Sequence, residues 1–501
     1  MEKYHFLKCS KICTLALAGA GALFFASCAK DGFDDESFDG GVSNTQVAAV
    51  AVDAITITPS ADGKTQTISW PVVMGAGGYR VTLVDVNNLS EPIINDSIVD
   101  GCSVTGKREE DVNYKVTILT LGNAKKNNKD ASEAVEKTFS TFTPTFKTIP
   151  AGADLKDWFA QNPTPTDSVG VNLNYDLEAG AQYTLSGTLD FNVQAVTLRS
   201  NSKANPATIN FTGEAMITFA APFNMKYMTV DCSKQDIGST NHGIFAFSKD
   251  PSGAPTGVDI DANKYKWANP LIEKPVTFVN STFKSVKSYF FWDNQQAVCA
   301  MTMLVDNCLI ELAPEKDFAG GVFWTNKGGH VNELYVTNST FYELPSCEHD
   351  YKYFYQAGMV RGEDIYADKN MATNTVSYTN STFYHVTWNG GQWGNYNGMA
   401  GRSYSVWTMT DCIFFDCSPS GVPRRFLHGK QNQNNVTFNN NTYMKADGTF
   451  QDIKDDGTHD YDHSGTTIEE DPLFANPAAG DFHISGPTQV ARKTGDPRWL
   501  P

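Results

Sequence analysis

Several features common in other protein classes are scarce in this chain, and each absence argues against a class of function or fold. Basic residues are few: 39 Lys and Arg stand against 56 Asp and Glu, which gives a formal net charge of −17. This balance argues against nucleic acid as a partner, and a polyanionic glycan would need a local basic patch or bound cations. No Cys-x-x-Cys pair occurs, so the spacing of a structural zinc site is missing. No segment carries a sustained helical period, which disfavours helical repeats.

Long apolar runs are also missing, apart from one at the start of the chain. Ile12–Ala26 is too short for an ordinary membrane span, follows three lysines and ends in small residues before Cys28. This pattern predicts a secretory signal over residues 1–27. The small residues before Cys28 resemble the bacterial lipobox, which implies that Cys28 is the lipid anchor of the mature chain. A plain signal peptide with an incidental cysteine is the alternative.

An acidic stretch follows Cys28. Lys30 and the run Asp34–Glu36 look like the surface-export signal of Bacteroidota lipoproteins, which implies an outer-membrane protein facing the cell exterior. Residues 28–47 are expected to form an acidic, flexible tether.

Residues 48–145 read as a sandwich of short strands separated by turns. Trp70 ends one strand, Tyr79 opens the next, and Tyr114 begins a late strand in which Val116 and Ile118 alternate with polar residues. This spacing resembles a fibronectin type III-like domain, with a core Trp and a Tyr near the start of a late strand. Such a domain is expected to be a spacer.

The most informative pattern is a line of eleven residues written six times between residues 276 and 446, of which LYVTNSTFYEL (334–344) is one copy. A β-rich run with alternating apolar residues leads to a column of Asn or Asp, expected to mark a bend. Three residues later stands a large apolar residue, expected to fill the core. The bend column is Asn280, Asp306, Asn338, Asn380, Asp411 and Asn440; the core column is Phe283, Leu309, Phe341, Phe383, Phe414 and Tyr443. Such a repeat predicts a solenoid of parallel strands over residues 146–501, with a short capping helix near Asp154–Phe159.

Ten cysteines occur, and seven remain after the signal and the anchor are set aside, so they cannot all pair within one chain. Cys308, Cys412 and Cys417 fall inside the repeated lines, where small buried thiols are expected.

A second recurring strand lies between these lines, and its alignment predicts a binding face. The alignment places Phe247, Trp292, Trp324, Arg361 and His428 in one column, with Lys249, Asn294, Asn326, Glu363 and Lys430 two places on. Equal columns of a parallel coil stack about 4.8 Å apart, so aromatic, cationic and amide groups would line one long face suited to sugars. A Gly/Asn-rich loop with Trp388 and Trp393 is expected to flank it. The candidate substrate-binding residues are Trp292, Trp324, Lys327, Arg361, Glu363, Trp388, Trp393, His428 and Lys430.

Catalysis is a separate hypothesis. A lyase that cleaves uronic-acid glycans by β-elimination needs a base, for which Arg361 and Arg402 are the candidates. It often needs Ca²⁺ held by carboxylates as well, whereas a binding protein requires no cofactor. No spacing of residues demands either role, and the metal ligands stay unknown.

The Asn-Ser-Thr-Phe lines, with Asp471–Phe474 and Gly480–Ile484, resemble the right-handed parallel β-helix of the pectate-lyase-like superfamily. Together with the lipobox and the type III-like domain, they resemble glycan-utilisation surface proteins that act beside outer-membrane carbohydrate transporters. The fold expected is all-β, a sandwich followed by a right-handed parallel β-helix. The function this resemblance implies is binding of a polysaccharide, with a pectin-directed lyase and an adhesin or structural protein as alternatives, since this fold carries several activities.

Overall fold

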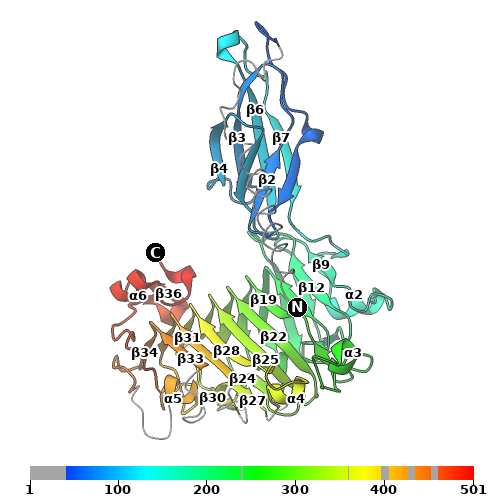
Figure 1. The fold of residues 1–501 in the computed structure, drawn as a ribbon. Coiled ribbons are helices and arrows are strands. Elements are labelled where there is room, and N and C mark those ends of the chain that lie inside the picture. Colours follow the sequence, from blue (N-terminus) through cyan, green and yellow to red (C-terminus); the bar gives the residue numbers. More distant parts are fainter. Residues whose placement is uncertain are drawn as a thin grey trace, which may run out of the picture. The chain divides into compact units, whose positions relative to one another are not determined.

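The structure is a computed structural model that describes residues 41–61, 63–237, 241–358, 360–396, 405–426, 435–452 and 461–501. The chain divides into two compact units, Met1–Pro144 and Thr145–Pro501. Figure 1 shows that the first is built from a few antiparallel strands and the second from a long coil of parallel strands. The predicted fold class is confirmed.

The N-terminal unit is a sandwich of two antiparallel sheets. One sheet has the order β1-β2-β5 and the other β4-β3-β6-β7. Their bounds are β1 Thr56–Pro59, β2 Thr65–Ser69, β3 Ala76–Asp85, β4 Ile94–Val99, β5 Ser103–Lys107, β6 Asn113–Gly122 and β7 Val135–Ser140.

The two aromatic residues singled out in the sequence hold this sandwich together. The ring of Tyr79 packs edge-on against Trp70 at a centroid distance of 5.2 Å. The hydroxyl of Tyr114, at the start of β6, accepts a hydrogen bond of 2.8 Å from the backbone N–H of Glu109. A tyrosine that bonds back to the chain just upstream is the corner typical of such sandwiches. Residues 44–47, which the sequence places in the tether, instead bond to this unit: the N–H of Asn44 donates to Lys126 and that of Val47 to Lys129.

The C-terminal unit is a coil whose turns add strands to three parallel sheets, here called sheets A, B and C. Sheet A contains β8 Lys147–Ile149, β9 Leu173–Leu177, β12 Val196–Ser200, β15 Phe223–Lys226, β19 Val276–Val279, β22 Cys299–Asp306, β25 His330–Thr337, β28 Asn374–Thr379, β31 Ser405–Thr410 and β33 Val436–Asn439, with β18 Leu271–Ile272 beside β22. Sheet B contains β10 Gln182–Leu185, β13 Ala207–Gly213, β16 Met228–Gln235, β20 Thr282–Val286, β23 Leu309–Leu312, β26 Thr340–Glu343, β29 Thr382–Tyr384, β32 Ile413–Phe415 and β34 Thr442–Met444. Sheet C contains β11 Thr188–Asp190, β14 Met216–Phe219, β17 Gly243–Phe247, β21 Tyr289–Trp292, β24 Phe318–Thr325, β27 Tyr351–Ala357 and β30 Gln392–Tyr396.

The bend column forms the corner between sheets A and B. Asn280, Asn338 and Asn380 adopt left-handed backbone angles, with φ between 47° and 51°. Asparagine tolerates this conformation because its short amide can bond locally. Asp411 and Asn440 share the conformation, with φ of 56° and 50°.

One copy of the repeat is shifted by a residue from the alignment made on sequence. The strand register pairs Val279 with Asp306 and Phe283 with Ile310. Asn307, with φ of 50°, therefore makes the bend, and Ile310 fills the core. The Asp-Asn pair offers two residues able to bend the chain, so the letters alone could not decide between them. The other predicted core residues are buried; Phe383 and Phe414, for example, stack at 4.9 Å.

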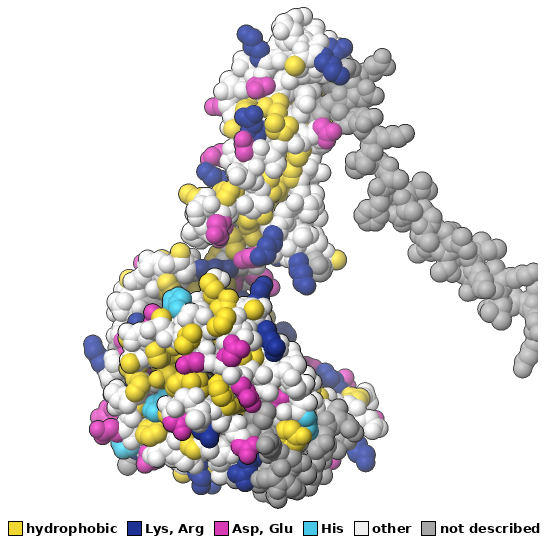
Figure 2. All heavy atoms as spheres, turned by 90° about the vertical axis from the view of Figure 1, so that its left-hand side faces the viewer, with side chains coloured by type: hydrophobic (Ala, Val, Ile, Leu, Met, Phe, Trp, Pro, Cys, Tyr) yellow, Lys and Arg dark blue, Asp and Glu magenta, His cyan; other side chains and the backbone are white. Residues whose placement is uncertain are grey.

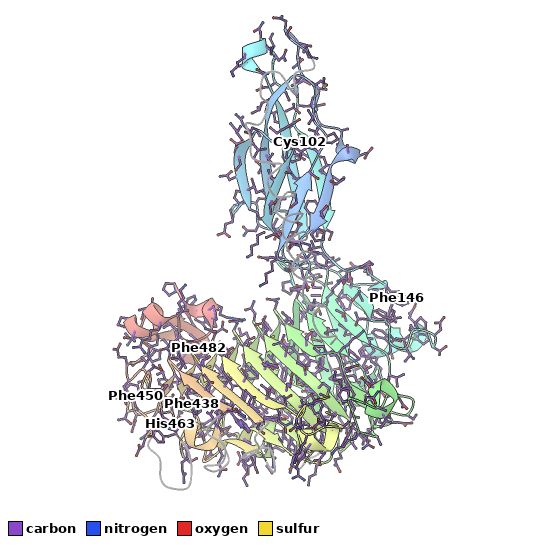
Figure 3. All side chains as sticks on the ribbon, in the orientation of Figure 1. Cys102, Phe146, Phe438, Phe450, His463 and Phe482 are labelled. Carbon is purple, nitrogen blue, oxygen red and sulfur yellow. The ribbon has the colours of Figure 1, made fainter. Side chains whose placement is uncertain are left out.

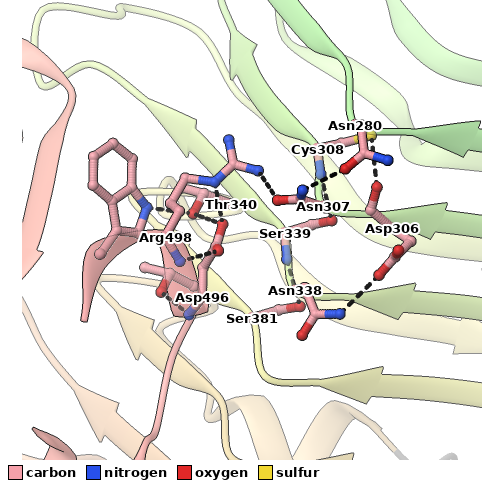
Figure 4. A network of polar contacts seen from close by, with 12 residues as sticks. Asn280, Asp306, Asn307, Cys308, Asn338, Ser339, Thr340, Ser381, Asp496 and Arg498 are labelled. Atoms are coloured by element: carbon pink, nitrogen blue, oxygen red, sulfur yellow. Dashed lines mark hydrogen bonds and ion pairs between the residues drawn. The ribbon is translucent and has the colours of Figure 1, made fainter. Parts of the chain in front are cut away.

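Polar side chains connect the bends from one turn to the next (Figure 4). The amide of Asn338 donates to Asp306 over 2.8 Å, and that of Asn307 donates to Asn280. One position on, hydroxyl groups accept from the backbone of the preceding turn: Ser339 accepts from the N–H of Cys308 and Ser381 from that of Ser339.

All seven cysteines among the described residues are free thiols. Cys308, Cys412 and Cys417 are buried, as predicted. Burial raises the pKa of the Cys308 thiol to about 12, so it is an unreactive packing residue. Cys102 lies within the N-terminal sandwich (Figure 3) and is half-buried.

A short helix covers the first end of the coil. The predicted capping helix is α2, Leu155–Gln161, and it buries Leu155 and Phe159; Asp154 accepts the N–H of Asp157 at its start. At the other end the chain returns through β35 Phe474–Asn476, β36 Asp481–Ile484, α6 Pro487–Arg492 and the short helix η5 Pro497–Trp499.

This last segment, residues 474–499, is here called the C-terminal strap, because it bonds to several turns at once. Asp496 accepts from the hydroxyl of Thr340 and donates its N–H to Thr382, while Arg498 donates to Asn307 (Figure 4). The ring of Phe482 packs against Tyr342 and Tyr384 of sheet B. No helix among the described residues is long and apolar enough to span a membrane.

Candidate functional site

The corner between sheets B and C carries a groove that crosses three turns of the coil. Phe318 pairs with Tyr351 in the register, and Tyr353 pairs with Gln392, so residues 318, 351 and 390 occupy equal places in successive turns. The groove has a volume of about 390 Å³ and is here called the corner groove. It is lined by Asp317, Phe318, Ala319, Asp350, Tyr351, Lys352, Asn389, Gly390 and Gly391. Because equal places recur at the strand spacing, a polymer lying along the coil would cross the same position of successive turns at regular intervals.

Asp350 fixes the wall of the corner groove. One of its carboxylate oxygens accepts the N–H groups of Tyr351 at 2.6 Å and Thr387 at 3.0 Å, and the other accepts that of Asn389 at 2.8 Å. The side chain is 4% exposed. Burial raises the pKa of Asp350 to about 6 against the opposing effect of these hydrogen bonds. Asp350 therefore acts on the groove by holding the 387–391 loop.

A second buried acid lies beneath Trp388. The indole N–H of Trp388 donates to Glu343 over 3.0 Å, and its ring stacks on His385 at 4.5 Å. His385 in turn pairs with Asp416 at 2.6 Å. Glu343 is 0% exposed; burial, helped by the charge of Asp350, raises its pKa well above the ordinary value and favours the neutral acid. Trp388 is thus held in place from below and is half-buried beside the groove.

The prediction from sequence omitted Glu343, His385 and Asp416 from this corner, although a pattern in the repeated lines could have identified them. The next-to-last column of the repeated lines is polar in every copy and holds Ser285, Glu311, Glu343, His385, Asp416 and Lys445. A polar column next to an apolar column indicates where the chain of each turn passes from the buried core to the surface.

The predicted second ladder is only partly right. Trp292 and Trp324 do share a column, as predicted, and their rings stack at a centroid distance of 6.4 Å. Ala246 and Gln356 occupy the neighbouring places instead of Phe247 and Arg361. The strand β27 ends at Ala357, so Arg361 lies beyond it. The strands of sheet C share no common motif, so the end of this strand could not be located from the sequence.

The two tryptophans do not form an open platform. Each is only 7% exposed, and glycines allow them to lie against the backbone. A Cβ atom on Gly243 would lie 2.8 Å from Cβ of Trp292, and one on Gly320 would lie 2.8 Å from the ring of Trp324. Trp393 is 0% exposed and stacks on Phe354 at 4.5 Å, so it is a core residue and the expectation that it binds substrate is wrong.

The predicted charged residues lie apart from the corner groove. Arg361 precedes α4, Gly362–Ile365, and forms ion pairs with Glu363 at 3.0 Å and Asp364 at 3.5 Å. Glu363 lines a separate, open hollow of about 500 Å³ together with Lys266, Asp364, Ala367, Asp368 and Lys369. Lys327 is exposed just after β24.

Four predicted residues lie outside the described residues: Cys28, Arg402, His428 and Lys430. Within the described part of the chain, no group of three or more His, Cys, Asp or Glu side chains is arranged to hold a metal ion.

Comparison with known proteins gives three partial matches to domain families. Each family is described only as a domain of unknown function: DUF4992 matches residues 1–185, DUF4957 residues 181–344 and DUF5123 residues 334–499. No curated protein matches the chain. The crystal structure of pectate lyase PelI from Erwinia chrysanthemi in complex with tetragalacturonic acid aligns over 85% of this chain and 97% of its own, at 9% identity and a TM-score of 0.17. This superposition is too loose to carry an argument, so the fold rests on the strand register alone.

Proposed function

We propose that this protein is a surface lipoprotein that binds a polysaccharide along its β-helix, with the corner groove as the binding site, in a glycan-utilisation system that includes an outer-membrane transporter. The observation that supports binding is the groove itself, which repeats equal lining positions over three turns. A ligand with a repeating backbone can follow such a groove because the lining positions recur at the same spacing in each turn. The lipid anchor and the surface location rest on the sequence around Cys28 and on the acidic stretch that follows it.

The charges favour a neutral or weakly charged glycan. The net charge is −17, and the groove carries Asp317 and Asp350 beside a single lining cation, Lys352. On the face shown in Figure 2, basic and acidic side chains are interspersed, without a basic patch that would hold a polyanion.

The lyase is the second candidate, and it is less well supported. The guanidinium of Arg361 is engaged by two carboxylates of its own segment, Glu363 at 3.0 Å and Asp364 at 3.5 Å. It also does not line the corner groove. An adhesin or structural role would leave the groove without a ligand.

Blocking the groove tests the proposal. Ala319 is exposed within it, so Ala319→Trp would fill the space without disturbing the core. Ala262, exposed after α3 (Gly257–Asp261) and outside the groove, gives the matched control Ala262→Trp.

The wild-type protein and both variants are run in affinity gels containing arabinan, galactan, xylan, mannan or homogalacturonan. We expect at least one neutral polysaccharide to retard the wild type and Ala262→Trp, and Ala319→Trp to bind at least tenfold more weakly. Equal retardation of all three proteins would exclude the corner groove. A rise in ultraviolet absorbance from unsaturated ends on homogalacturonan would establish the lyase instead.

A further inference from the structure

A second concave site lies at the opposite edge of the early turns, on sheet A. It is a cleft of about 450 Å³, lined by the segment that follows α2 and by the insertion that carries α3. Its floor is formed where four successive strands begin: Asn172 precedes β9, Ala195 precedes β12, Pro222 precedes β15 and Pro275 precedes β19. The cleft therefore extends along the coil, and it is here called the strand-start cleft.

One side of the strand-start cleft is a row of polar side chains. Asn172 donates to Thr197 at 3.0 Å, Asn224 donates to the same hydroxyl at 3.3 Å, and Thr277 donates to Asn224 at 2.7 Å. Adjacent members belong to adjacent strands, so the row advances by one strand spacing, about 4.8 Å, at a time.

The other walls are apolar. They include Val169, Ala221, Pro222, Pro255, Ile260 and Leu271. Val169 stands at the rim and is 47% exposed. The charged residues of the lining, Glu273 and Lys274, are of opposite sign and both exposed, so the interior carries no net charge.

The hydrogen-bonding groups of the polar row indicate what kind of ligand the cleft can bind. Asn224 uses one of its two amide hydrogens on Thr197, and the hydroxyl oxygen of Thr277 accepts no bond from a described residue. A hydrocarbon chain would cover these groups without bonding them, which is unfavourable for each polar group left without a partner. A ligand with hydroxyl groups along one edge and C–H groups on its faces would satisfy both sides.

We propose that the strand-start cleft binds a short, neutral chain of about three sugar units, one for each strand-to-strand step along the polar row. The sugar hydroxyls bond Asn172, Asn224 and Thr277, and the C–H faces of the rings lie on the valine, proline and leucine side chains. This site is independent of the corner groove, which lies between sheets B and C.

The test uses two valines that are two residues apart on one loop. Val169 lines the cleft, whereas Val171 is 57% exposed and does not, so Val169→Trp should close the site and Val171→Trp should not. Asn224→Ala removes the central polar group without adding bulk. All three substitutions are made in the Ala319→Trp background, so that the corner groove cannot contribute.

Binding of cellotriose, xylotriose, mannotriose, laminaritriose and maltotriose is measured by calorimetry and by saturation-transfer NMR. At least one trisaccharide should bind the Val171→Trp protein and bind at least tenfold more weakly after Val169→Trp and Asn224→Ala. The inference is overturned if none of the five binds, or if binding survives both cleft substitutions. Either failure would leave the corner groove, which is judged by polysaccharide retardation of Ala319→Trp alone, unaffected.

Discussion

The bends between sheets A and B allow the effect of the left-handed backbone on stability to be measured separately from the effect of a side-chain hydrogen bond. Asn338 and Asn380 share the left-handed backbone, with φ of 49° and 47°, but only Asn338 uses its side chain, donating to Asp306 over 2.8 Å. Asn380 makes no side-chain hydrogen bond to a described residue, so the two sites differ by one interaction.

Alanine in this conformation costs about 1 kcal/mol from the clash of its Cβ with the following carbonyl. Loss of a hydrogen bond to a carboxylate adds about 1.5 kcal/mol. We therefore expect Asn380→Ala to lower the free energy of unfolding by about 1 kcal/mol and Asn338→Ala by about 2.5 kcal/mol. Glycine accepts the left-handed backbone, so Asn380→Gly should be nearly neutral, while Asn338→Gly should still lose about 1.5 kcal/mol.

Urea unfolding of the four variants, followed by circular dichroism, gives these differences. The comparison between sites is more reliable than any single value, because both substitutions act on the same kind of corner. The reasoning fails if the two alanine variants are equally destabilised, or if glycine is no better than alanine at either site.

Two further predictions concern protonation and the anchor. Burial raises the pKa of Asp350 and of Asp496 to about 6, so the folded state keeps protons that the unfolded state releases near pH 4. The free energy of unfolding should therefore fall as the pH rises from about 3 to about 7, by about 3 kcal/mol for each group. In urea unfolding at several pH values, Asp350→Asn should show a smaller fall than the wild type, and an unchanged pH dependence would contradict this. For the anchor, Cys28→Ala should abolish incorporation of labelled palmitate and release the protein from the membrane fraction of its host. The control Cys102→Ala should change neither property. Palmitate labelling that persists in Cys28→Ala would exclude Cys28 as the site of lipid attachment.

The coil could be predicted because the same two structural requirements recur in every turn. Each turn must bend once at the same place and fill the same place in the core, and the Asn and Phe columns record both needs. The one copy that was misread, at Asp306–Leu309, contains two adjacent residues able to bend, and only the hydrogen-bond register distinguishes them.

The site was harder to predict because binding residues obey no such repeat. Trp292 and Trp324 looked like a platform, but exposure depends on what packs over a side chain, here the strand backbone next to Gly243 and Gly320. Glu343 and Asp350 come together with Trp388 only because loops of successive turns meet at one corner. Loop lengths vary from turn to turn, so sequence spacing does not reveal such meetings.

The C-terminal strap changes how the coil must assemble. Most contacts in a solenoid join neighbouring turns, and such a molecule can form or fray piecewise from either end. Here the last residues of the chain, Asp496 and Arg498, bond to turns built from Asn307, Thr340 and Thr382, more than a hundred residues earlier. These contacts therefore cannot form until the chain has been made as far as residue 498, and a chain cut before Asp496 would lose the bonds between the strap and the middle turns while keeping the strand pairings that join those turns to one another.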